Sequence, residues 1–237
     1  MNKTKIQWTE MTWNPITGCT KISEGCRNCY AARMAKRLKA MGNPRYINEF
    51  QVTVHEDLLE VPLGIKKPKM IFVNSMSDLF HEDVSDEVIV RVFETMNKAD
   101  WHTFQVLTKR PERVMKMDQE GLLKWAPNIW MGTTVESGNF IERIDMLRKT
   151  KACIKFLSCE PLLGSLKDLC LDKIDWVIVG GESGPKSREM KREWVLEIKE
   201  KCEKNEVAFF FKQWGGINKK KSGRLLDGKT YDEYPCQ

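Results

Sequence analysis

The sequence lacks any long hydrophobic run. No stretch approaches the roughly 18 apolar residues that a membrane helix needs, and the first eight residues contain no apolar segment typical of a signal peptide. There is also no internal repeat and no low-complexity segment. We therefore expect a cytoplasmic protein with no membrane partner.

Nothing in the composition is typical of a disordered chain. Hydrophobic residues make up 41% of the 237 residues and charged residues 30%, a balance that supports a buried core. This length favours one domain that spans residues 1–237, with a C-terminal extension from about residue 217. The formal net charge of +6 is compatible with an anionic partner such as nucleic acid.

Short apolar runs recur at the spacing of strand–helix repeats. Their continuous apolar character is typical of strands covered on both faces. Between two of them, residues 85–100 predict an amphipathic helix that begins after Ser85, and residues 193–205 predict another. The predicted strands are 7–12, 70–73, 104–107, 129–131, 153–157, 176–179 and 207–211.

This pattern predicts an α/β fold. We expect a TIM-like full or partial (β/α) barrel with a cysteine-bearing loop after the first strand, and an open doubly wound sheet is the alternative. In either fold the site lies at the carboxyl ends of the strands. Polar residues follow six of the predicted strands, although turns are polar in any protein. The candidate site residues at these strand ends are Asn74, Ser75, Asp78, Lys109, Glu136, Glu160 and Glu182, together with the glycines Gly180 and Gly181.

Three cysteines are closely spaced. Cys19, Cys26 and Cys29 form a C-x6-C-x2-C pattern before a predicted helix at 30–38, whereas the other five cysteines are scattered. Thiolates at this spacing are typical ligands of zinc, copper(I) or an iron–sulfur cluster. No histidine or cysteine lies between Cys29 and His55, so a fourth ligand is missing nearby. We favour a catalytic iron–sulfur cluster. A zinc site completed by His55 or His81, and reduced structural thiols, are the alternatives.

These features together resemble the radical S-adenosylmethionine (SAM) superfamily, and more closely its phage-associated three-cysteine-motif branch. The resemblance covers nearly the whole chain. One departure is the first cysteine gap, which is six residues here and three in most of the superfamily. The matching stretches are Trp13-Asn14-Pro15, Gly18-Cys19, Gly25-Cys26-Arg27-Asn28-Cys29-Tyr30-Ala31, 72–80, 107–111, 180–184 and 225–228.

The resemblance implies a [4Fe-4S] cluster on the three cysteines, with SAM bound at the open iron. Reduction by an electron donor such as flavodoxin or ferredoxin would cleave SAM to a 5′-deoxyadenosyl radical. The cytoplasm would be bacterial, or that of the host if the chain is phage-encoded. The residues implied to bind SAM are Tyr30, beside the adenine, and Asn74, Ser75, Asp78, Gly180, Gly181 and Glu182. The residues implied to act on the substrate are Lys109, Glu136, Cys159 and Glu160.

The resemblance further implies a nucleic acid or nucleotide substrate, most concretely a glycine-bearing thymine in phage DNA that is isomerised. Basic groups at 109–110, 191–192 and 219–221 are compatible with DNA. A radical DNA-lesion lyase, with Cys159 as hydrogen donor, is one alternative, although Cys159 also fits a buried thiol. A zinc- or cluster-stabilised nucleic-acid-binding module is another.

Overall fold

The computed structural model describes residues 2–236, apart from the side chains of Asn2, Lys219 and Lys220. Its main sheet has eight strands in the order β1-β2-β5-β6-β7-β8-β9-β10. All neighbours from β2 to β10 pair in parallel, and only β1 is antiparallel. The strands are β1 (Asn2–Lys3), β2 (Met11–Trp13), β5 (Met70–Val73), β6 (Thr103–Thr108), β7 (Ile129–Thr134), β8 (Ile154–Cys159), β9 (Trp176–Gly180) and β10 (Ala208–Gln213).

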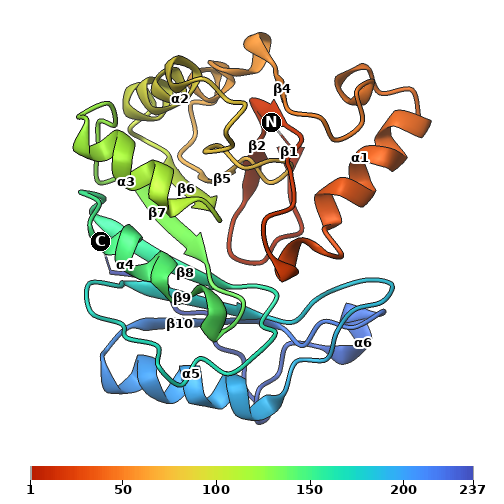
Figure 1. Ribbon diagram of the computed structural model, residues 1–237, viewed down its shortest axis with the longest axis vertical. Helices are drawn as coiled ribbons and strands as arrows, with labels where there is room; N and C mark the ends of the chain where they lie inside the picture. Colours follow the sequence, from red (N-terminus) through yellow and green to blue (C-terminus); the bar gives the residue numbers. More distant parts are fainter. Residues whose placement is uncertain (1, 237) are drawn as a thin grey trace.

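The sheet curls into an open half-barrel, and four helices lie around its outer side, namely α2 (Asp86–Lys98), α3 (Pro111–Gln119), α4 (Glu142–Arg148) and α5 (Arg192–Lys204) (Figure 1). The seven parallel strands follow one another in space as they do in the sequence, so the sheet has no point at which the strand order reverses. The prediction of a partial TIM-like barrel is confirmed, and the doubly wound alternative is wrong.

The helices follow the predicted periodicity. Helix α2 begins after Ser85, whose hydroxyl accepts a hydrogen bond from the Val88 amide at 3.4 Å, and it buries Val92, Phe93 and Met96. The α-helices are α1 (Tyr30–Ala40), α2 (Asp86–Lys98), α3 (Pro111–Gln119), α4 (Glu142–Arg148), α5 (Arg192–Lys204) and α6 (Lys219–Ser222). Short 3-10 helices cover Glu24–Cys26, Pro44–Tyr46, Glu56–Leu58, Val61–Gly64 and Gly138–Phe140.

A second, two-stranded sheet was not predicted. It pairs β3 (Ile16–Thr17) with β4 (Thr53–Val54) in antiparallel register. Two-residue pairings carry too little periodic signal to be seen in a sequence, because tertiary contacts rather than local propensity create them. This small sheet joins the start of the cysteine loop to the segment that precedes β5.

Alternating residues of the parallel strands build two separate cores. One side of the sheet packs against the helices through residues such as Val106, Met131 and Val177. The other, concave side is filled by an aromatic cluster, whose buried members are Trp8, Trp130, Phe156, Trp176, Ile178 and Phe210. The Trp176 ring contacts the four other buried rings of this cluster, with centroids 5.6 to 6.3 Å from those of Trp8, Trp130, Phe156 and Phe210. The aromatic cluster closes the amino-terminal half of the barrel, which leaves the carboxyl end for polar groups.

Residues 231–233 run along the edge of the sheet at β10. The Phe211 amide donates to the Tyr231 carbonyl at 2.9 Å, and the Phe209 amide donates to the Glu233 carboxylate at 2.9 Å. Covering an edge strand in this way prevents its free backbone groups from pairing with another chain. Across residues 2–236, no helix combines the length and the apolar character that crossing a membrane requires.

We predict that Trp176→Ala destabilises the fold by about 3–5 kcal/mol, because it removes the side chain at the centre of the aromatic cluster and leaves a cavity. Chemical denaturation would measure the free energy of unfolding. Ile217→Ala is the control, since Ile217 is 81% exposed and should change the stability by less than about 0.5 kcal/mol. Equal stability of the two variants would contradict the described packing.

Candidate functional site

The cysteine loop runs across the carboxyl ends of the parallel strands. At its start, the Gly18 amide donates to the Met76 carbonyl at 3.0 Å, and the Cys19 amide donates to the Phe50 carbonyl at 3.1 Å. Gly18 has φ of +88°, and a Cβ there would overlap the backbone of Gln51, so only glycine fits. The backbone thus fixes where the first cysteine lies.

All three cysteines of the loop are free and half-buried. No three cysteine, histidine or carboxylate side chains of residues 2–236 are gathered closely enough to hold a single metal ion. The two histidines considered for a zinc site are engaged elsewhere: His55 lies 2.9 Å from the Thr17 hydroxyl, and His81 lies 2.8 Å from the Thr20 hydroxyl. The structure therefore contains no assembled Cys3His site.

The thiols of Cys19 and Cys26 lie in different electrostatic surroundings. Burial and the nearby Asp78 raise the pKa of Cys19 to about 11, despite Arg110, whose guanidinium lies 3.6 Å from its Sγ. Burial also acts to raise the pKa of Cys26, but a backbone hydrogen bond from Ile22 and the charge of Lys109 outweigh it and lower the pKa. The cations that follow β6 therefore face two thiols of the loop.

Asp78, which follows β5, is at the centre of a buried network. Its carboxylate accepts hydrogen bonds from the Thr108 hydroxyl at 2.6 Å and the Lys109 amide at 3.1 Å, and it pairs with Arg110 at 3.2 Å. The same guanidinium donates to the Thr20 hydroxyl at 2.9 Å. Asp78 is thereby linked to the loop through Arg110.

Glu136, which follows β7, is fully buried. Arg143 donates to it at 2.8 Å, the Ser23 hydroxyl of the cysteine loop also donates to it, and the Lys109 ammonium lies 4.0 Å away. The Ser23 hydroxyl in turn lies 3.6 Å from the Cys26 Sγ.

Glu182, which follows β9, has both carboxylate oxygens engaged. Arg188 donates to them at 2.6 and 3.0 Å, and Asn28 of the cysteine loop donates at 2.9 Å. Burial acts to raise the pKa of Glu182, but the hydrogen bonds from Arg188 and Asn28 outweigh it and lower the pKa to about 2. Glu182 is therefore ionised at neutral pH.

Glu160, which follows β8, pairs with a residue that the sequence analysis had not assigned a role. Its carboxylate lies 2.8 Å from the Lys212 ammonium and accepts from the Ser158 hydroxyl at 3.3 Å. The Glu160 side chain passes over Gly180, where a Cβ would be only 2.6 Å from its oxygen. Gly181 similarly leaves room for the Trp214 backbone, so both glycines accommodate protein atoms.

Asn74 has an unsatisfied side chain. It is only 2% exposed, has φ of +60°, and neither atom of its amide finds a partner among the described residues. Its neighbour Ser75 donates to Asn14 at 3.1 Å. A buried amide without partners is costly, which points to a ligand or water at the carboxyl end of β5.

Two predicted site residues lie apart from this polar network. Cys159 is fully buried in the core between the sheet and the helices, where burial raises its pKa well above the ordinary value. Tyr30, the first residue of α1, is 62% exposed. The placement of Cys159 favours its alternative interpretation as a buried thiol.

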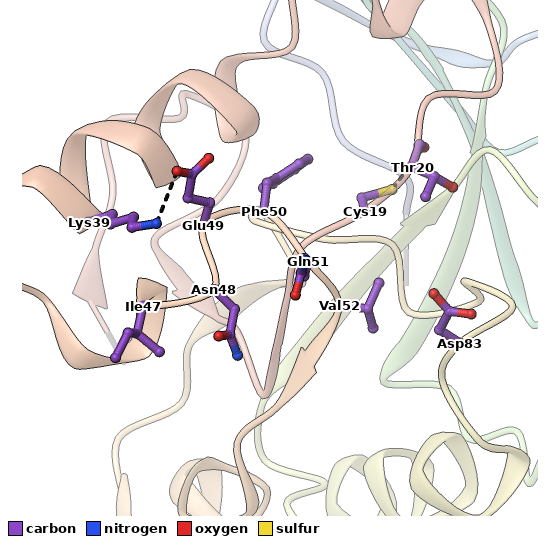
Figure 2. A pocket seen from close by; sticks show the side chains of 10 residues that line it. All are labelled: Cys19, Thr20, Lys39, Ile47, Asn48, Glu49, Phe50, Gln51, Val52 and Asp83. Atoms are coloured by element: carbon purple, nitrogen blue, oxygen red, sulfur yellow. Dashed lines mark hydrogen bonds and ion pairs between the residues drawn. The ribbon is translucent and has the colours of Figure 1, made fainter.

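A cleft of about 870 Å³ opens on the outer side of the cysteine loop. Cys19 and Thr20 line it together with residues 47–52 and Asp83, and a Lys39–Glu49 ion pair of 3.1 Å lies at its far end (Figure 2). The first cysteine is therefore accessible from solvent.

The donor set fits an iron–sulfur cluster. Three half-buried thiols on one loop, two of them facing cations, suit a negatively charged group with soft ligands. The described residues show no assembled metal-binding group among these cysteines, so the fit is one of ligand chemistry and not of geometry.

The chain belongs to the family described as "Protein of unknown function (DUF5131)", whose model matches residues 3–235. No curated protein matches significantly. Among solved structures, the chain is similar to "Spore photoproduct lyase complexed with dinucleoside spore photoproduct", with 13% identity and a TM-score of 0.47. The match covers 86% of this chain and 63% of the lyase chain. The chain therefore spans less than two thirds of the length of the lyase.

We predict that Glu182→Gln lowers the free energy of unfolding at neutral pH, and that this difference from wild type shrinks as the pH falls from about 5 to about 2. The folded pKa of Glu182 is about 2, below the unfolded value, so its contribution is present above the unfolded pKa and is lost as the pH falls through the folded one. Denaturant titrations at several pH values would measure it. A difference that does not change with pH would contradict this ionised network.

Proposed function

We propose that this member of the DUF5131 family is a radical SAM enzyme that acts on a nucleobase. The observation that carries the proposal is the position of Cys19, Cys26 and Cys29, which lie half-buried on a loop that contacts residues following the parallel strands β5, β6, β7 and β9. These cysteines would hold a [4Fe-4S] cluster and leave one iron open. When bound, the cluster and SAM supply a 5′-deoxyadenosyl radical that removes a hydrogen atom from the substrate.

The chain's own residues would bind and orient SAM and the substrate, and would exclude water from them. The unpartnered amide of Asn74 and the neighbouring Ser75 are suited to the polar methionine end of SAM. Tyr30, exposed at the start of α1 directly after Cys29, is the residue proposed to contact the adenine. Glu160 and Lys212 form an ion pair of 2.8 Å at the carboxyl ends of β8 and β10, which suits them to contact with the substrate. The aromatic cluster would exclude water from the amino-terminal side of the half-barrel.

The most concrete substrate is a glycine-bearing thymine in phage DNA, which the enzyme would isomerise. This part of the proposal is supported by the sequence resemblance and by the net charge of +6. An electron donor such as flavodoxin or ferredoxin, in a bacterial or host cytoplasm, would complete the system. A radical DNA-lesion lyase would share the chemistry and differ in substrate.

Anaerobic reconstitution should give a brown protein that holds about four irons per chain and releases 5′-deoxyadenosine when it is reduced with SAM. Changing Cys19, Cys26 or Cys29 to Ala should abolish both iron binding and release. Cys153→Ala is the matched control, because Cys153 is exposed and lies far from the loop in the sequence. A colourless protein with one bound zinc and no 5′-deoxyadenosine would refute the proposal.

We predict that Cys159→Ala leaves the product of the reaction unchanged. Cys159 is buried among apolar side chains and does not belong to the polar network at the strand ends, so it is badly placed to donate hydrogen to a substrate. Chromatography of the products from wild type and variant would test this. Loss of the correct product with an intact cluster would instead favour a lyase that depends on a thiyl radical.

A further inference from the structure

We infer that Asp78, Glu136 and Glu182 are positioning residues that hold the cysteine loop against the barrel, rather than ligands of SAM or of the substrate. They follow β5, β7 and β9, which are alternate strands of the sheet. The nature of the group on the cysteines rests on the proposed function, whereas the anchoring itself is a property of the free chain.

Each carboxylate reaches the loop beside a different cysteine. Asp78 acts through Arg110, which contacts Thr20 and the Sγ of Cys19. The other two carboxylates contact the loop directly. Glu136 accepts from Ser23, whose hydroxyl lies 3.6 Å from Cys26 Sγ. Glu182 accepts from Asn28 at 2.9 Å, next to Cys29 in the chain.

Each carboxylate is also neutralised by its own arginine. The pairs are Asp78 with Arg110 at 3.2 Å, Glu136 with Arg143 at 2.8 Å, and Glu182 with Arg188 at 2.6 Å. Three unpaired carboxylates beside three thiolates would repel them, and burying an unpaired charge is costly. Pairing allows directional hydrogen bonds to the loop without adding net negative charge next to the thiolates.

The oxygen atoms of these carboxylates are already occupied. Asp78 accepts from Thr108, Lys109 and Arg110, and Glu136 is fully buried. A substrate or cofactor would have to displace these internal donors to reach either group. Glu160 differs, because it pairs with Lys212 and has no described hydrogen bond or ion pair to residues 18–29.

The first test uses the metal-free chain. Hydrogen exchange of the amides of residues 18–29 should accelerate about tenfold or more in Asp78→Asn, Glu136→Gln and Glu182→Gln, because a hydrogen bond to a charged group shifts a local opening equilibrium by such a factor. Glu160→Gln is the matched control and should exchange like wild type in this loop. Since no cluster is needed, this test is independent of the proposed function.

The second test uses the reconstituted chain. Iron content should fall in the three anchor variants and not in Glu160→Gln. Where Asp78→Asn retains a cluster, its reduction potential should shift in the positive direction, because the positive charge of Arg110 beside Cys19 is no longer neutralised. A residue that only stabilised the fold would leave the potential of the remaining cluster unchanged.

Loop-side variants keep the inference testable if a core carboxylate cannot be replaced without unfolding. Ser23→Ala and Asn28→Ala remove the partners of Glu136 and Glu182 while leaving the barrel intact, and they should accelerate the same amides. Wild-type exchange in both sets of variants, with full iron content, would overturn the inference. Faster exchange with no iron bound to any form would support anchoring and refute the cluster.

Discussion

The parallel pairing of seven strands in chain order is the constraint on which the rest of the structure depends. It brings the carboxyl ends of all seven strands to one edge, although the residues that follow them are separated by up to 200 positions in the sequence. Because successive side chains alternate between the two faces, the same pairing separates an apolar layer under the helices from an aromatic cluster on the concave side. The charged residues of the site then collect at the strand ends.

Charge at these ends is arranged in pairs. Arg110, Arg143, Arg188 and Lys212 each face one carboxylate at 2.6 to 3.2 Å. Pairing of this kind is necessary where the groups are buried, because an isolated charge in such a place would lose its hydration without compensation. The cysteine loop lies over three of these pairs and takes its shape from them.

Much of the fold could be predicted from the sequence, because its signals are periodic. The apolar runs at 70–73 and 176–179, and the Ser85 cap of α2, reappear in the structure nearly unchanged. The sequence could also identify Asp78 and Glu136 as strand-end residues. It could not identify their partners, since Arg110, Arg143 and Ser23 are ordinary residues in a sequence and become significant only when the strands are paired. The role of Lys212 was missed for the same reason. Its position in the last strand carries no signal that it will face Glu160.

Cys159 and its neighbour Glu160 show how the register of a strand determines which side chain reaches the site. Cys159 and Glu160 are adjacent at the end of β8, and both were candidates for catalysis. The strand alternation directs Cys159 into the core beneath α5, while Glu160 crosses Gly180 to reach Lys212. A shift of one residue would exchange their surroundings and would bury the carboxylate among apolar side chains. The aromatic cluster opposes such a shift, because Phe156 on β8 and Trp176 on β9 are paired in register and pack with ring centroids 5.6 Å apart. Packing at the closed end of the half-barrel therefore determines which side chain is available at the open end.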